Sequence, residues 1–219
     1  MQIPGLEVQG LRKSYILGER EIPVLTGVDV TVSTGEIVVI MGPSGSGKTT
    51  LLNCVSGIAV PDAGQVKIAG RSIDMHSSRE RTLLRRHRIG IVFQFFNLIP
   101  TLTVEENVGL PFVIAGKAGP DTATRVDAML ETVGLPDPPQ MVGAYPHELS
   151  GGMQQRVMIA LALASDASLL IADEPTTALD VTIQAQILTL LTQLKESRGL
   201  SILLITHNLG VVAETCDRV

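Results

Sequence analysis

The stretch IVVIMGPSGSGKTT, residues 37–50, decides the fold. A short apolar run is followed by a glycine-rich loop with the spacing G-x-x-x-x-G-K-T and then by an apolar segment typical of a helix. Glycines allow backbone N–H groups to turn inward around a phosphate, and the following helix directs its positive end at the same point. The stretch therefore predicts a strand–loop–helix unit that binds nucleotide phosphates.

The loop and the first turn of the helix supply the candidate phosphate-binding residues. They are Gly42, Pro43, Ser44, Gly45, Ser46, Gly47, Lys48, Thr49 and Thr50. We expect Lys48 to reach the β- and γ-phosphates and the Thr49 hydroxyl to bind Mg²⁺. The predicted ligands are therefore ATP and Mg²⁺.

Three further apolar runs, residues 89–93, 169–172 and 202–205, are nearly continuous rather than alternating. Such runs are typical of strands buried on both faces of a parallel sheet. Helical spacing of apolar residues lies between them, at 126–133 before Gly134 and at 183–194 before Gly199. The pattern predicts an α/β fold with an open, mostly parallel sheet.

Two other parts of the chain have a different character. The first 35 residues alternate between apolar and polar, which predicts antiparallel strands, and residues 64–70 resemble another strand. The segment from residue 95 to about residue 163 is mainly helical and separates the second core strand from the third. We therefore expect one domain over residues 1–219. Residues 1–93 and 164–219 form its core with an antiparallel β subdomain, and residues 94–163 form an inserted helical lobe.

Polar residues follow the other predicted core strands. Asp173 and Glu174 end the run at 169–172, Gln94 follows the run at 89–93, and His207 follows the run at 202–205. Ligands of open α/β sheets bind beyond the carboxyl ends of the strands, so these residues are expected near the phosphate loop. We expect Asp173 to hold Mg²⁺ through water and Glu174 to act as general base. Gln94 is expected to contact Mg²⁺ or the attacking water, and His207 the γ-phosphate.

Composition excludes several classes of function. The 219 residues carry a net charge of −5, with 3% aromatic residues and no tryptophan, so nucleic-acid binding is disfavoured. We expect no signal peptide, because residues 1–10 show no basic start followed by an apolar run, and no apolar run is long enough to span a membrane. Cys54 and Cys216 are interpreted as reduced core residues. The basic run at 78–88 favours a solvated helix face, with contact to a membrane or a partner as the alternative.

Six motifs share the order and spacing of one known family. They are the phosphate loop, Gln94, LSGGM (149–153), LLIADEP (169–175), TTALD (176–180) and THNL (206–209). The set resembles the ATP-binding cassette (ABC) family over essentially the whole chain. The resemblance implies a P-loop ATPase fold with a RecA-like core and a transport-coupled ATPase activity.

The resemblance also implies a head-to-tail dimer, a homodimer for this chain. In that family each ATP lies between the phosphate loop of one subunit and the LSGGM segment of the other. Ser150, Gly151, Gly152 and Met153 are then expected to bind the partner's ATP, with the N-terminus of a helix that starts near Met153 behind them. Asp180 is expected to link the two sites across the dimer.

Three details concern single residues. Tyr15 resembles the aromatic residue that stacks on adenine, although an ordinary strand aromatic fits equally well. Met153 stands where the family usually has Gln, and Asn208 where it usually has Asp. The chain stops at Val219, where the resemblance implies a further strand.

The two halves of the sequence resemble different branches of the family. Residues 37–53 and 89–111 resemble ATPases of macrolide export and lipoprotein release, whereas 145–164, 174–188 and 208–219 resemble those of peptide and nickel importers. The apolar segment from Phe95 to Pro100 is expected to dock an integral-membrane permease, at the cytoplasmic face of the membrane. Its sequence favours the export and lipoprotein-release class. A peptide or nickel importer, or a non-transport ATP switch in cell division or signalling, is the alternative.

Overall fold

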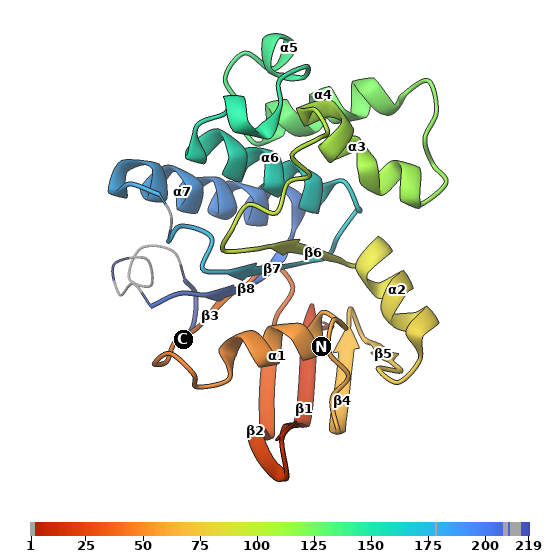
Figure 1. Cartoon of the computed structure of the whole chain (residues 1–219), viewed down its shortest axis with the longest axis vertical. Coiled ribbons are helices and arrows are strands. Elements are labelled where there is room, and N and C mark those ends of the chain that lie inside the picture. The colour runs from red at the N-terminus through yellow and green to blue at the C-terminus, as the bar shows by residue number, and fades with distance from the viewer. Residues whose placement is uncertain (1–2, 178, 208–209, 211–215) are drawn as a thin grey trace.

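The computed structural model describes residues 3–177, 179–207, 210 and 216–219. Its central feature is a sheet of four parallel strands in the order β3-β8-β7-β6. The strands are β3 (Ile37–Ile40), β6 (Ile89–Val92), β7 (Leu169–Asp173) and β8 (Ser201–Ile205). Almost every residue in them is buried, because helices or a second sheet cover both faces (Figure 1). The predicted parallel sheet is confirmed.

A second, antiparallel sheet lies below the core sheet in Figure 1. It has the order β2-β1-β4-β5, formed by β1 (Leu6–Leu17), β2 (Arg20–Val32), β4 (Ala63–Ile68) and β5 (Arg71–Ile73). Helix α1 (Lys48–Val55) lies between the two sheets, and its Leu51 and Leu52 share one apolar cluster with residues of both. The strand–loop–helix unit at residues 37–55 therefore joins the two halves of the core.

Helices cover the opposite face of the core sheet. They are α3 (Val104–Ile114), α4 (Thr122–Thr132), α5 (Pro138–Met141), α6 (Gly151–Leu163) and α7 (Val181–Arg198), with a 3₁₀ turn at Pro146–Glu148. These elements share a second apolar cluster with the upper face of the sheet (Figure 1). The expected helical spacing is confirmed, because Val126, Leu130 and Val133 are buried and Gly134 follows with φ 64°.

The largest difference from the sequence expectation is the start of α6. The helix begins at Gly151, two residues before the expected Met153, and Ser150 is its N-cap, accepting a hydrogen bond from the Met153 N–H at 3.3 Å. A Cβ on Gly152 would lie 2.8 Å from the Ile183 side chain of α7. The glycine pair is therefore helical and permits close packing of α6 against α7, which outweighs the low helix propensity of glycine.

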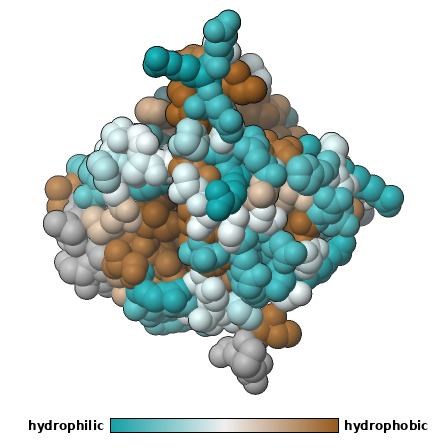
Figure 2. Space-filling view, turned by 90° about the horizontal axis from the view of Figure 1, so that it is seen from below, coloured by the Kyte–Doolittle hydropathy of each residue, from teal (hydrophilic) through white to brown (hydrophobic). Residues whose placement is uncertain are grey.

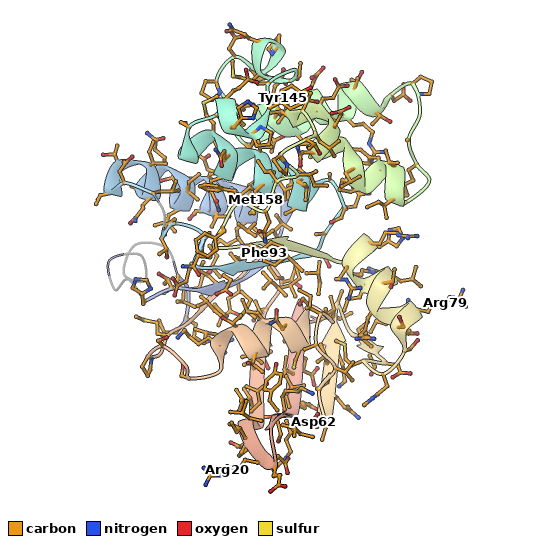
Figure 3. The ribbon with its side chains drawn as sticks, in the orientation of Figure 1. Arg20, Asp62, Arg79, Phe93, Tyr145 and Met158 are labelled. Atoms are coloured by element: carbon orange, nitrogen blue, oxygen red, sulfur yellow. The ribbon has the colours of Figure 1, made fainter. Side chains whose placement is uncertain are left out.

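Helix α6 also approaches the sheet closely. A Cβ on Gly90 in β6 would lie 2.5 Å from the Ala162 carbonyl oxygen, so only glycine fits there. The Phe93 N–H, just after β6, contacts the Met158 sulfur at 3.2 Å, and these two side chains lie together between helices and sheet in Figure 3. The strand end that carries Gln94 is thus fixed directly on α6.

The basic run forms α2 (Ser78–His87) at the side of the molecule. Leu84 is its buried residue, Arg79 points into solvent, and Arg85 donates to the Gly57 carbonyl at 2.6 Å (Figure 3). The face seen from below is mainly hydrophilic, with its largest apolar area left of the centre and smaller apolar areas elsewhere (Figure 2). No helix among the described residues combines the length and apolar character that crossing a membrane requires.

Candidate functional site

The carboxyl ends of the four parallel strands converge on one pocket of about 690 Å³. The phosphate loop (residues 42–49) follows β3, Gln94 follows β6, Asp173 and Glu174 end β7, and His207 follows β8. All four strand ends contribute lining residues, as does the antiparallel sheet through Tyr15 and Val24. The structure therefore brings together the residues that sequence reasoning placed at separate strand ends.

Two glycines of the phosphate loop have backbone conformations that favour glycine, with φ 78° at Gly45 and φ 92° at Gly47. A Cβ on Gly47 would also lie 3.0 Å from a methyl group of Val24. Gly47 is the N-cap of α1 and provides no side-chain cap. The positive end of α1 therefore faces the pocket without a protein side chain on it, an arrangement suited to an anion.

The Lys48 ammonium group lies within this loop. It donates to the carbonyl oxygens of Gly42 at 2.7 Å and Pro43 at 2.8 Å, and Ser46 Oγ lies 3.5 Å away. The loop thus holds a cation at its centre, among backbone groups that can turn toward phosphate oxygens. This arrangement fits a triphosphate.

Thr49 and Asp173 form the part of the pocket that fits Mg²⁺. Thr49 Oγ1 donates to Asp173 Oδ2 at 3.2 Å. Burial raises the pKa of Asp173, and the Thr49 hydrogen bond partly opposes this effect. The described residues contain no group of three or more His, Cys, Asp or Glu side chains able to hold a metal ion. Mg²⁺ matches the pair because it binds one or two protein oxygens and takes its other ligands from phosphates and water.

Glu174 is held by two neighbours. Thr177 Oγ1 donates to Glu174 Oε2 at 2.9 Å, and His207 Nδ1 lies 3.2 Å from Glu174 Oε1. Partial burial would raise the pKa of Glu174, but the hydrogen bonds from Thr177 and His207 outweigh it and lower the pKa below its usual value. The carboxylate is therefore charged at neutral pH and can accept a proton. Its backbone is in the left-handed region, with φ 48°.

Tyr15 lies on β1 at the rim of the pocket, with 43% of its surface exposed. The Lys13 ammonium lies 5.5 Å from the centre of its ring. An exposed ring beside the phosphate loop is placed to stack on a nucleobase.

The second group of predicted residues does not line this pocket. Ser150, Gly151, Gly152 and Met153 form the start of α6, and Asp180 is the N-cap of α7, accepting from the Ile183 N–H at 3.0 Å. Ser150 and Asp180 are exposed. The structure therefore separates the candidate residues into an internal pocket and an external surface.

Sequence reasoning missed two residues of the site. Val24 lines the pocket, and Thr177 donates a hydrogen bond to Glu174. Only Thr177 could have been suspected from the sequence, because it follows Glu174 by three residues. In the expected docking segment, Phe95 is 71% exposed and Ile99 40%, whereas Phe96 and Leu98 pack against the helical cluster. Asn208 lies outside the described residues.

The fold and the pocket define the class of this protein: it is a P-loop nucleotide-binding protein with acidic residues at a neighbouring strand end. The family model described as ABC transporter matches residues 25–177. The chain therefore belongs to the ABC transporter family and is one of its ATP-binding subunits, which hydrolyse ATP with Mg²⁺. Subunits of this family dimerise and act with membrane permease components. The predicted fold, ATPase activity and ligands are confirmed.

Several relatives are named for import. The chain is 44% identical to an ATP-binding protein of Brucella ovis named for peptide import, over 99% of this chain and 68% of that one. It is 43% identical to the methionine import ATP-binding protein of Streptomyces coelicolor, over 97% of this chain and 61% of that one.

The solved structures that resemble the chain are ABC cassettes. The cassette MJ0796, determined as a dimer bound to ADP and Pi, is 39% identical, with a TM-score of 0.84 over 94% of this chain and 89% of that one. The protein cbiO1 of Clostridium perfringens, part of the transporter complex cbiONQ, is 30% identical, with a TM-score of 0.84 over 99% of this chain and 83% of that one.

Proposed function

We propose that this chain is the ATP-hydrolysing subunit of an importer that takes up peptides or a small amino-acid solute. The observation that carries this proposal is the set of relatives named for peptide and methionine import, which are 43–48% identical over 89–99% of the chain. These relatives favour the importer alternative over the export and lipoprotein-release class. The expectation of an export or lipoprotein-release ATPase rested on short stretches in the N-terminal half, including residues 95–100, and the relatives do not support it.

The pocket geometry supports a role for each residue in hydrolysis. Lys48 neutralises charge on the β- and γ-phosphates, and Thr49 and Asp173 hold Mg²⁺, Asp173 through water. Bound Mg²⁺ supplies charge stabilisation to the phosphoryl oxygens as the bond to the leaving oxygen breaks. Lys48 is held by the loop carbonyls and Thr49 by Asp173, so these groups already lie in the pocket before ATP binds.

Glu174 acts as the general base. It takes one proton from the attacking water while the water oxygen bonds to the γ-phosphorus and ADP leaves. His207, at 3.2 Å from Glu174, orients this carboxylate. His207 and Gln94 line the same pocket, where His207 would contact the γ-phosphate and Gln94 would contact Mg²⁺ or the attacking water. The lowered pKa of Glu174 keeps the base ionised before the reaction.

A second copy of the chain completes the site. Residues 150–153 and Asp180 are exposed or half-buried on helix N-termini, and they do not line the pocket of their own chain. A helix N-terminus with an exposed serine and two glycines offers backbone donors to an anion. The cassette MJ0796, solved as a dimer bound to ADP and Pi, supports the formation of a dimer by this chain.

An apolar groove supports permease docking. It has a volume of about 330 Å³ and lies between α2, β6, α3 and α6, with Phe93, Pro111 and Ile114 in its wall and Arg85 and Arg86 at its side. Phe95 is exposed in the segment that follows Phe93. We place the permease on this groove and on the 95–100 segment, which would hold the chain at the cytoplasmic face of the membrane.

Transport in vesicles tests the proposal. The chain and its permease are reconstituted with ATP on the side of the chain, and labelled tripeptide and labelled methionine are offered on the opposite side. Accumulation of either solute on the ATP side, lost with Glu174→Gln, is the expected result. Movement of a macrolide away from the ATP side would overturn the importer assignment, and ATP turnover that moves no solute would favour a switch.

A further inference from the structure

Three loops of the candidate site are fastened in the same way. Each precedes a helix whose N-cap side chain accepts a hydrogen bond from the third N–H of that helix, at Thr103, Ser150 and Asp180. Each helix then carries an amide side chain four residues after the cap, at Asn107, Gln154 and Gln184.

The three amide groups make the same two contacts. Each amide nitrogen donates to backbone carbonyls five and eight positions earlier in the chain. The carbonyls belong to Leu102 and Ile99 for α3, Leu149 and Pro146 for α6, and Leu179 and Thr176 for α7. The distances are 2.9–3.1 Å, and a carboxamide is suited to this role because one NH₂ group provides two donors.

We call each pair of hydrogen bonds from such an amide an amide clamp, and the three clamped loops carry or adjoin candidate site residues. The loop before α3 follows Gln94, the loop before α6 leads into the LSGGM segment, and the loop before α7 joins Glu174 to Asp180. Helix α2 provides the comparison, since it has an N-cap at Ser77 that accepts from Glu80, but the fourth residue after that cap is Arg81. The loop before α2 carries none of the candidate site residues.

The α7 clamp bears most directly on the chemistry. Thr176 and Leu179 lie between Glu174, the proposed base, and Asp180, the proposed partner contact. The Thr177 N–H donates to the Glu174 carbonyl at 3.2 Å, and the Leu179 N–H to the Thr176 carbonyl at 3.1 Å. These turns are tied to the helix by Gln184, at 2.9 Å to each of its two carbonyls.

We propose that Gln184, with Gln154 and Asn107 in the matching places, is a positioning residue for ATP hydrolysis. Its two donated hydrogen bonds fix Thr176 and Leu179 on α7, so that Glu174 and Asp180 are held in one rigid arrangement when two copies close on ATP. The inference rests on the proposed roles of these two residues. It assigns the effect of Gln184 to its donors, not to its packing.

Substitutions separate donors from packing at this half-buried position. Gln184→Met keeps the size and removes both donors, Gln184→Glu keeps the length and presents an acceptor to two carbonyls, and Gln184→Lys keeps donors on a chain of different shape. We expect kcat to fall about tenfold in the Met variant, further in the Glu variant, and least in the Lys variant. KM for ATP and nucleotide binding by the separate subunit stay unchanged, because Gln184 does not line the pocket.

The outcomes distinguish this inference from the proposed function. Parental kcat in the Met variant, or a Met variant more active than the Lys variant, would overturn the donor role. If the parental chain hydrolyses no ATP, the proposed function fails instead. Should the Gln184 variants not fold, the same three substitutions at Gln154 give the test, with the same order of activity expected and the same result contradicting it.

Discussion

The pocket at the strand ends and the surface around Ser150 and Asp180 differ in one respect. The pocket is assembled from six separate segments of this chain, and its side chains hold one another, as in the Thr49–Asp173 and Glu174–His207 contacts. On the surface, the caps are satisfied only by their own helices, and Ser150 and Asp180 are exposed. One chain therefore contains a pocket that fits a nucleotide and a separate surface that, under our proposal, completes the site of another chain.

The largest effect should come from Glu174→Gln. The change removes the proposed base, so we expect turnover to fall by about 10²- to 10⁴-fold while ATP still binds. With the γ-phosphate retained, the variant should form a long-lived dimer with ATP, which light scattering detects. Glu196→Gln, an exposed position on α7, is the matched control. Hydrolysis by Glu174→Gln at the parental rate would remove the base assignment.

A second variant tests the surface alone. Ser150→Arg places a bulky side chain at the start of α6, so hydrolysis should fall on the order of 100-fold through loss of contacts to the partner's nucleotide. Binding of a fluorescent ATP analogue by the separate subunit should not change, because Ser150 does not line the pocket.

Ser197→Arg, at an exposed site near the end of α7, controls for the added charge. Equal turnover in the two arginine variants would show that the surface around Ser150 does not complete a site.

The pocket is tested by Lys48→Ala. Loss of an ammonium group that contacts phosphate should weaken ATP binding by about 10- to 100-fold, as measured by calorimetry on the separate subunit. Lys117→Ala, an exposed lysine of the helical region, should have no effect on the same measurement. ATP affinity that survives Lys48→Ala unchanged would contradict the phosphate-loop geometry.

The smallest effect is expected at Tyr15. A stacked ring contributes about 0.5–1.5 kcal/mol, so Tyr15→Ala should weaken ATP binding by about 2- to 10-fold. Tyr145, which has 41% of its surface exposed and lies in the helical region (Figure 3), is the matched control as Tyr145→Ala. If both tyrosine variants bind ATP equally well, Tyr15 is an ordinary strand residue.

The sequence predicts the pocket better than the surface, for a physical reason. Continuous apolar runs mark buried strands, and the residue after each run must lie at the carboxyl edge of a parallel sheet, which was enough to place Gln94, Asp173 and His207. The sequence placed the start of α6 two residues too late, because a glycine pair has low helix propensity. The Ser150 cap and the close approach of Gly152 to Ile183 are seen only in the structure.

The amide clamps illustrate the other limit. Gln154 and Gln184 bind carbonyls whose positions depend on the path of the preceding loop, and residue type alone does not reveal that path. An amide residue four positions after an N-cap is recognised as a pattern only when the structure shows the same contacts in three loops. Likewise, Thr177 follows Glu174 closely in sequence, but its contact depends on the left-handed backbone at Glu174.

The central claim is that two copies enclose each triphosphate, one with residues 42–49 and the other with residues 150–152. A structure of the Glu174→Gln chain with ATP and Mg²⁺ tests it most directly. We predict a head-to-tail dimer in which residues 150–152 of one copy lie within hydrogen-bonding distance of the γ-phosphate bound by the other. An ATP-bound structure in which residues 150–152 lie far from every γ-phosphate would contradict the account.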